Sequence, residues 1–314
     1  MTDGGAFMKH RLFLFAVSLL MTCAFIAGCS SSTANSGGTH SDAALSKTVT
    51  IRMLDAGQGD AILIDTGAEV VLIDTSDVDE RKLFMGALEK AGIDKVDKLI
   101  LTHAHADHIG GAEPLMKKYQ VGAIYDNGIA STSKLFTGYR KMAKEKGIPV
   151  TALKAGDRLD LGNGVSFKVL GPSADRVKAE NQRVKKNSKD DAPSPNNDSI
   201  VGMLQCGDFR MLFTGDAEAV MEKEYVAEYG DELSADVLKS PHHGSKTSSC
   251  LEFLKTVSPA YVVISLGEGN DYGHPHKEPL KRYAKLGAEV LETDINGTIT
   301  ITTDGRDYQI EGER

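Results

Sequence analysis

Short runs of apolar residues with strand or helix spacing begin near residue 47 and continue to the end of the chain. Alternating, β-branched runs bounded by glycine predict strands, and apolar residues three or four positions apart predict helices. The predicted strands cover residues 48–54, 61–64, 70–73, 98–102, 121–125, 165–170, 199–205, 210–213, 235–238 and 261–265, followed by terminal strands. The predicted helices cover residues 81–91, 112–119, 133–146, 217–228, 249–257 and 279–286. Because the early strands follow one another and the later ones alternate with helices, we expect an α/β fold with two sheets between helical layers.

The N-terminal residues have a different pattern. A basic segment at 9–11 is followed by an apolar, uncharged stretch at 12–27 and by small residues before Cys29. This order resembles a bacterial lipoprotein signal peptide, which implies cleavage before Cys29 and a lipid on its thiol. The alternative is a retained membrane helix, although the stretch is near the lower length limit for a span. We therefore expect an exported protein, lipid-anchored to the outer face of a bacterial cell membrane.

These patterns divide the chain into three parts. Residues 1–29 are the expected signal peptide. Residues 30–46 are rich in Ser, Thr, Gly, Ala and Asn without periodicity, as in a flexible linker. Residues 47–314 form the expected globular domain.

Charge and cysteine content narrow the possible functions. The formal net charge of −8 argues against a broad, basic nucleic-acid surface, although a local basic groove remains compatible with it. Beyond Cys29, which would carry the lipid, the chain has two cysteines, Cys206 and Cys250. They form either a disulfide or two buried free thiols, and the sequence leaves both options open.

Residues 173–198 interrupt the regular pattern. A basic cluster within this stretch precedes two aspartates and a Pro-Ser-Pro sequence and consists of Arg183, Lys185, Lys186 and Lys189. We predict a long polar loop, which is either a solvated surface loop or a flap whose positive charges meet an anionic substrate.

The densest chemistry lies directly after the strand predicted at 98–102. His103, His105, Asp107 and His108 occur within six residues, and two glycines follow. His103 and His105 point the same way on an extended backbone, while Asp107 and His108 follow on a turn. Imidazole and carboxylate groups suit Zn²⁺, Mn²⁺ or Fe. The segment therefore predicts a metal site.

This segment resembles the HxHxDH signature of the metallo-β-lactamase superfamily. Three further stretches extend the resemblance, and they contain Asp74, Asp216 and the pair His242–His243. The resemblance implies an αββα four-layer sandwich and two divalent metal ions, Zn or Mn, bridged by Asp216. It also implies that Asp74 fixes a ligand histidine by a hydrogen bond. Adjacent residues of an extended chain point oppositely, so one of His242 and His243 is the expected ligand, and we favour His243.

Finer motifs are similar to the hydrolase-like domain of ComEC competence proteins. They occur at residues 55–60, 196–199, 240–245 and 270–275. The transmembrane channel of those proteins has no counterpart in this sequence, so the resemblance does not imply DNA uptake.

One departure from the superfamily concerns the first metal position. Most members place a histidine between the HxHxDH motif and the bridging aspartate, but no histidine occurs here between His108 and His242. Asp198 is our candidate for the substitute ligand and Asn197 the second, with a turn or cap role as the alternative. An oxygen ligand there would favour Mn²⁺ relative to Zn²⁺.

The implied mechanism uses a hydroxide activated by two metals. Asp107 would bind the second metal and orient the nucleophile, and His274 would protonate the leaving group unless it is a surface turn residue. Asp60 either supports the site or caps a turn. Residues 245–248 either hold an anion at a helix start or cap that helix.

Three functions fit these residues. The first is a phosphodiesterase or nuclease acting on extracellular DNA or nucleotides. The second is a carbon-centred hydrolase of a lactone, thioester or β-lactam, because the same metals serve both chemistries. The third is a surface protein that binds DNA without cutting it. The sequence indicates no oligomeric state.

Overall fold

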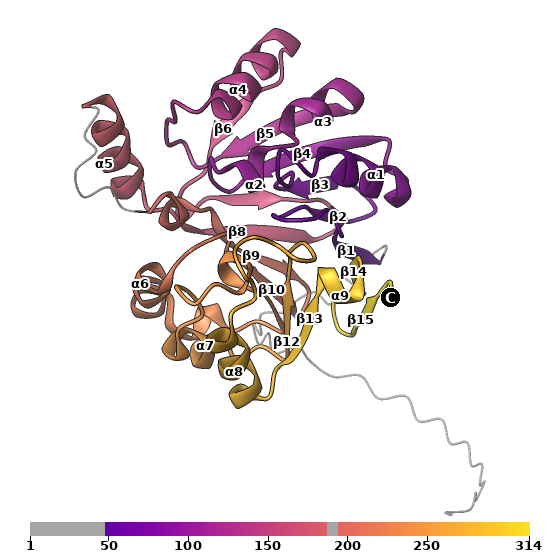
Figure 1. Ribbon diagram of the computed structural model, residues 1–314, viewed down its shortest axis with the longest axis vertical. Coiled ribbons are helices and arrows are strands. Elements are labelled where there is room, and N and C mark those ends of the chain that lie inside the picture. The colour runs from indigo at the N-terminus through magenta and orange to yellow at the C-terminus, as the bar shows by residue number, and fades with distance from the viewer. Residues whose placement is uncertain (1–47, 187–193) are drawn as a thin grey trace, which may run out of the picture. The chain divides into compact units, whose positions relative to one another are not determined.

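Two β-sheets pack face to face and helices cover both outer faces, as the computed structural model shows (Figure 1). The structure describes residues 48–186 and 194–314. The predicted αββα sandwich is therefore confirmed. The expected signal peptide, the linker and Cys29 lie outside the described residues. Across the two described ranges, every helix is too short or too polar to cross a membrane.

The first sheet has eight strands in the order β15-β14-β1-β2-β3-β4-β5-β6. Its strands are β1 (Val49–Met53), β2 (Ile62–Asp65), β3 (Val70–Ile73), β4 (Lys95–Leu101), β5 (Gln120–Asp126), β6 (Val150–Ala152), β14 (Ile299–Thr303) and β15 (Tyr308–Gly312). The strands from β3 to β6 run parallel, and the remaining neighbours pair antiparallel.

The second sheet has seven strands in the order β13-β12-β11-β10-β9-β8-β7. Its strands are β7 (Arg158–Asp160), β8 (Val165–Gly171), β9 (Val201–Cys206), β10 (Phe209–Phe213), β11 (Val237–Lys239), β12 (Tyr261–Ile264) and β13 (Glu289–Glu292). The strands from β10 to β13 run parallel, which brings the loops after these strands to one edge of the sheet.

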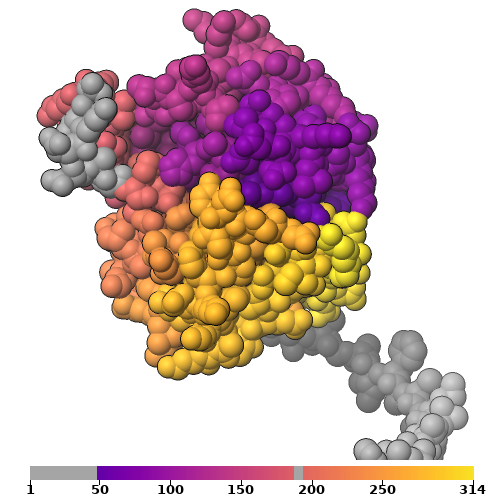
Figure 2. Space-filling model, in the orientation of Figure 1, coloured from indigo at the N-terminus to yellow at the C-terminus, as the bar shows by residue number. Residues whose placement is uncertain are grey.

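Three apolar cores match the layers. The central core lies between the sheets, where β1 alternates buried and partly exposed residues and contributes Val49, Ile51 and Met53. A second core packs the first sheet against α1 (Arg81–Ala91), α3 (Ala112–Lys118) and α4 (Lys134–Lys146). A third packs the other sheet against α6 (Ala219–Tyr229), α7 (Leu251–Val257) and α8 (Lys277–Leu286). In Figure 2 the indigo-to-magenta and the orange-to-yellow segments gather on two sides of the domain.

Local signals account for several helix boundaries. Helix α4 begins after Ser133, whose hydroxyl accepts a hydrogen bond from the N–H of Phe136 at 3.1 Å. Helix α1 ends at Gly92, which has the left-handed φ of 70° that glycine adopts without strain. The remaining short helical segments are α2 (Ala106–Ile109), α9 (Thr293–Asn296), η1 (Pro195–Asp198), η2 (Gly230–Leu233) and η3 (Pro241–Gly244).

The prediction of a long loop at 173–198 is wrong for most of this stretch. Helix α5 (Ala174–Lys185) begins after Ser173, whose hydroxyl accepts the N–H of Arg176, and η1 follows the undescribed residues 187–193. The helix has no continuous apolar stripe, and its one buried residue is Glu180. The spacing of apolar residues along the sequence therefore did not predict a helix here. Lys189 lies outside the described residues.

The two cysteines are free thiols, so the disulfide alternative is not realised. Cys206 is buried and Cys250 is partly buried. Burial raises the pKa of both thiols to about 11, so they are protonated and unreactive at neutral pH.

Candidate metal centre

The candidate site lies where β3, β4, β10 and β11 end. The segment after β4 carries the histidine cluster, and the turn after β10 carries Asp216. The η3 turn after β11 carries His242 and His243, and Asp74 follows β3 directly. Loops from both sheets therefore converge on one region.

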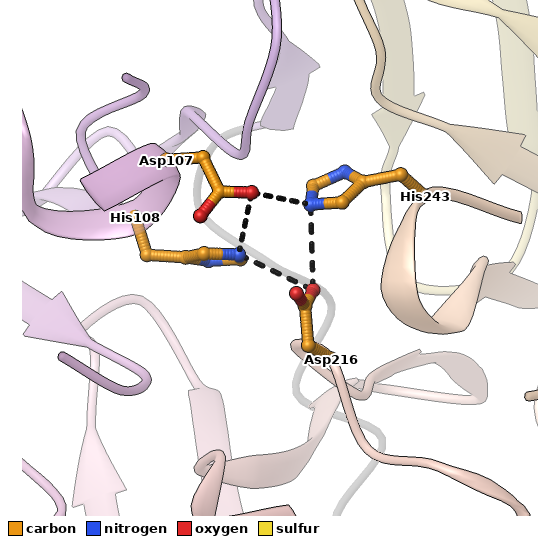
Figure 3. A group of neighbouring side chains, drawn as sticks. All are labelled: Asp107, His108, Asp216 and His243. Atoms are coloured by element: carbon orange, nitrogen blue, oxygen red, sulfur yellow. Dashed lines mark ion pairs between the residues drawn. The ribbon is translucent and has the colours of Figure 1, made fainter. Parts of the chain in front are cut away.

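Four side chains form the tightest group: Asp107, His108, Asp216 and His243. Each offers one ligand atom within 4.8 Å of the others, and all four point toward a common centre (Figure 3). The Oδ1 atom of Asp216 lies 3.2 Å from Nε2 of His108 and 3.4 Å from Nε2 of His243. The Oδ2 atom of Asp107 lies 3.4 Å from the same nitrogen of His243.

A second group consists of His103, His105 and Asp216, again within 4.8 Å. The Oδ2 atom of Asp216 lies 3.9 Å from Nε2 of His103. Asp216 thus presents one carboxylate oxygen to each group, which is the arrangement that a bridging ligand between two cations requires.

Hydrogen bonds to Nδ1 orient the histidines. Nδ1 of His108 lies 2.7 Å from Oδ2 of Asp74, and Nδ1 of His243 lies 2.8 Å from the carbonyl oxygen of Ser265. Nδ1 of His103 lies 3.3 Å from the hydroxyl of Ser199. The Nε2 atoms are consequently free to face the centre, as in metal sites whose ligands are fixed by outer partners.

The inward-facing atoms lack partners. Nε2 of His103, His108 and His243, together with Oδ1 of Asp216, are buried without a hydrogen bond. Such atoms are destabilising by about 1–3 kcal/mol each unless a ligand satisfies them. Imidazole nitrogens and carboxylate oxygens in this arrangement fit a pair of divalent cations.

The carboxylates and imidazoles of the centre shift one another's pKa values. Burial lowers the pKa of His108 and of His243, but the carboxylate of Asp216 outweighs it and raises both. Burial opposes ionisation of Asp216, but the His108 and His243 imidazoles outweigh it and hold the pKa of Asp216 well below its usual range. Burial, reinforced by the charge of His108, lowers the pKa of His103 well below its usual range. An ionised carboxylate and a neutral imidazole are the forms that bind metal.

The expectation that His242 and His243 point oppositely is wrong. Both residues adopt left-handed backbone conformations, with φ of 49° and 51°, rather than the extended geometry on which that expectation rested. Both rings therefore approach the centre. His243 belongs to the four-residue group, whereas Nε2 of His242 lies 3.7 Å from Oδ2 of Asp216 and its Nδ1 lies 3.2 Å from the hydroxyl of Thr247.

Asp198 and Asn197 do not take the position of the absent histidine. Oδ1 of Asp198 accepts a hydrogen bond from Nε of Arg176 at 2.7 Å, and burial raises the pKa of Asp198 to about 6. The amide oxygen of Asn197 accepts the N–H of Glu218 at 3.0 Å. The prediction of Asp198 as a substitute ligand is therefore corrected, and the alternative of a turn residue describes Asn197, which lies within η1.

Asp60 lies behind the centre and pairs with a lysine that the sequence analysis missed. Nζ of Lys239 lies 3.0 Å from Oδ1 of Asp60, and both side chains are buried. The same Oδ1 lies 3.6 Å from Nδ1 of His243. Gly59 lets this loop approach the histidine cluster, because a Cβ there would lie 2.0 Å from the carbonyl oxygen of Asp107.

His274 lies beside the centre, and its ring stacks at 25° on that of His243 with centroids 6.3 Å apart. Burial, followed by the charges of His243 and His242, lowers the pKa of His274 to about 4. The imidazole is therefore neutral at neutral pH, which does not fit the predicted role of a protonated general acid.

The hydroxyls predicted to hold an anion at residues 245–248 have partners within the protein. The hydroxyls of Ser245 and Thr247 lie 3.1 Å apart, and Ser248 donates to the carbonyl oxygen of Ala217. These contacts support the histidine turn and leave no evident anion cradle.

Two mixed sheets packed as a sandwich, with a His and Asp cluster at the strand ends, are the arrangement of metal-dependent enzymes of the metallo-beta-lactamase fold. Residues 54–268 match the model of the metallo-beta-lactamase superfamily, and the chain belongs to this superfamily. It is 34% identical over 268 residues to ComE operon protein 3 of Bacillus subtilis, covering 79% of this chain and 32% of that protein. It is 32% identical over 251 residues to competence protein ComA of Neisseria gonorrhoeae, covering 79% of this chain and 31% of that protein. The chain thus spans about a third of the length of these relatives.

A solved structure shows the same fold. The metallo-beta-lactamase fold protein YhfI from Bacillus subtilis superposes with a TM-score of 0.51 at 13% identity, covering 82% of this chain and 99% of that one.

Proposed function

We propose that this chain is a two-metal phosphodiesterase that cleaves DNA or nucleotides outside the cytoplasm. The observation that carries the proposal is Asp216, whose two oxygens face two separate groups of ligand atoms. One relative is named a competence protein and another, from Haemophilus influenzae, a recombination protein, which supports a nucleic-acid substrate over a lactone or β-lactam.

The chain would hold one cation with Asp107, His108, Asp216 and His243 and the other with His103, His105 and Asp216. Two divalent cations, Mn²⁺ or Zn²⁺, would supply a nucleophile at neutral pH and stabilise negative charge on a phosphoryl oxygen. Asp107, whose side chain is partly accessible, would orient that nucleophile.

The substrate would approach from the side of His103 and His105. A cavity of about 250 Å³ opens there, and α5 forms one of its walls through Arg183 and Val184. The guanidinium of Arg183 contacts Glu180, which holds it at this wall.

The test is a substrate panel with the full-length chain in detergent, supplied with Mn²⁺ or Zn²⁺. We expect turnover of bis-p-nitrophenyl phosphate and single-stranded DNA, abolished in His108→Ala, and no turnover of nitrocefin. Turnover of nitrocefin alone would establish the carbon-centred alternative instead. DNA binding that survives in His108→Ala, from a parent without hydrolysis, would establish the non-catalytic alternative.

We further propose that Cys29 carries a lipid that anchors the chain to the outer face of the bacterial cell membrane. The basic and apolar residues before Cys29 support this. Labelled palmitate should enter the wild-type chain and not Cys29→Ser; equal labelling of both would exclude Cys29 as the lipid site.

A further inference from the structure

The group formed by His103, His105 and Asp216 has fewer donors than the other group. It contains three residues, whereas the group around His243 contains four. Nε2 of His242 lies 3.7 Å from Oδ2 of Asp216, but within the described ranges no further His, Cys, Asp or Glu offers a ligand atom within 4.8 Å of all three. A cation there needs an additional donor, and we consider the side chains on the side of His103 and His105.

Asn196 lies on that side. Its side chain is buried, and its Oδ1 atom has no hydrogen-bond partner. Pro195 and Asp198, on either side of it along the chain, line the same cavity as His103 and His105. The short segment of Asn196 therefore borders the side of the centre where these two histidines lie.

His242 fixes which way the amide points. Nδ2 of Asn196 lies 3.3 Å from Nε2 of His242 and 3.5 Å from its Nδ1, so the amide nitrogen faces this ring. The hydroxyl of Thr247, 3.2 Å from Nδ1, holds the ring in place. With its N–H directed at His242, the amide turns its oxygen away from that ring.

The short segment that carries Asn196 is held rigidly on both sides. Asn127 donates to the carbonyl oxygen of Asp198, whose carboxylate pairs with Arg176. Asn197 binds both the N–H and the carboxylate of Glu218. A donor on such a segment is preorganised, so little conformational entropy is lost when it binds a cation.

We propose that Oδ1 of Asn196 is a ligand of the cation held by His103, His105 and Asp216. The amide oxygen takes the place that the sequence analysis assigned to Asp198. It is neutral and harder than an imidazole nitrogen, so this position selects Mn²⁺ relative to Zn²⁺. The inference rests on the proposed two-metal function and specifies the first of its two positions.

Titration calorimetry of the metal-free, full-length chain with Mn²⁺ tests this without any substrate. The wild type should bind two equivalents. Asn196→Ala should weaken one of them by about tenfold or more and leave the other unchanged. Asn196→Asp should restore the weakened equivalent, and Asn196→His should shift the ratio of Zn²⁺ to Mn²⁺ affinity toward Zn²⁺.

Gln309→Ala is the matched control, because it removes a side-chain amide from an exposed position on the edge strand β15. It should bind both equivalents as the wild type does. Asn196→Ala with two unchanged affinities would overturn the proposal. Equal weakening of both Mn²⁺ equivalents, together with a lower melting temperature of metal-free Asn196→Ala, would also overturn it, since this result indicates a structural role for Asn196. If the wild type binds two equivalents but cleaves no phosphodiester, the proposed function fails and the ligand assignment stands.

Discussion

The ion pair of Lys239 and Asp60 offers the sharpest test of how the centre is supported. Nζ of Lys239 lies 3.0 Å from Oδ1 of Asp60 and 2.9 Å from the carbonyl oxygen of Ser240, and both charged side chains are buried. Replacing Lys239 with Met retains the volume and removes the cation, leaving Asp60 with an uncompensated charge.

The distance sets the size of the effect. At an effective dielectric constant of about 20, charges 3.0 Å apart attract by roughly 5 kcal/mol. Removal of one partner from a buried pair typically lowers the free energy of unfolding by about 3–5 kcal/mol. We therefore expect Lys239→Met to be destabilised by about 4 kcal/mol. The double variant Asp60→Asn/Lys239→Met should recover part of this loss, because no buried charge is left.

Urea unfolding of the metal-free proteins measures the loss without a contribution from bound cations. Lys285→Met is the matched control, because Lys285 is exposed on α8, and its effect should stay within about 0.5 kcal/mol. A loss below about 1 kcal/mol for Lys239→Met would refute the reasoning, since it would mean that water or another cation compensates Asp60.

Three further changes probe other parts of the domain. Asp74→Asn should weaken metal binding by about 10–100-fold, because the Asp74 carboxylate holds Nδ1 of His108 at 2.7 Å. Calorimetry measures this affinity, and an unchanged value would contradict the role of Asp74. Burial raises the pKa of Glu222 from 4.5 to about 7, against the opposing backbone N–H bonds from Ser249 and Cys250. The folded state thus holds this proton more tightly than the unfolded state, and the resulting stability, about 3 kcal/mol, is present below pH 4.5 and is lost as the pH rises through 7. Urea unfolding across this range should show a flatter profile for Glu222→Gln than for the wild type, and identical profiles would reject the assignment. Gly59→Ala should lower the melting temperature strongly, because Gly59 has a φ of 107° and a Cβ there would lie 2.0 Å from a backbone oxygen. A melting temperature equal to that of the wild type would show that the loop can move.

Residues outside the ligand groups position the metal-binding atoms of the histidines. Asp74 and Ser265 each hold the Nδ1 of one inward-facing histidine. The ligand atoms are thus positioned before any cation binds, which reduces the reorganisation that binding requires.

Much of this protein followed from local sequence. Strand β3 and helix α1 have the predicted bounds, because their apolar spacing and the glycine after the helix are local signals. The spacing within residues 103–108 indicated metal ligands, since few structural roles require so many imidazoles together.

Other features depended on the tertiary structure. The left-handed turn at His242 and His243 overrides the alternation of an extended chain. Lys239 reads as an ordinary lysine until the fold buries it against Asp60. Asn196 faces the centre only because Arg176 and Glu218, each about twenty residues away, hold the residues that follow it. The sequence alone determined the kinds of side chain available for metal binding. The fold decided which of their atoms meet, because convergence depends on long-range packing between loops that no local pattern encodes.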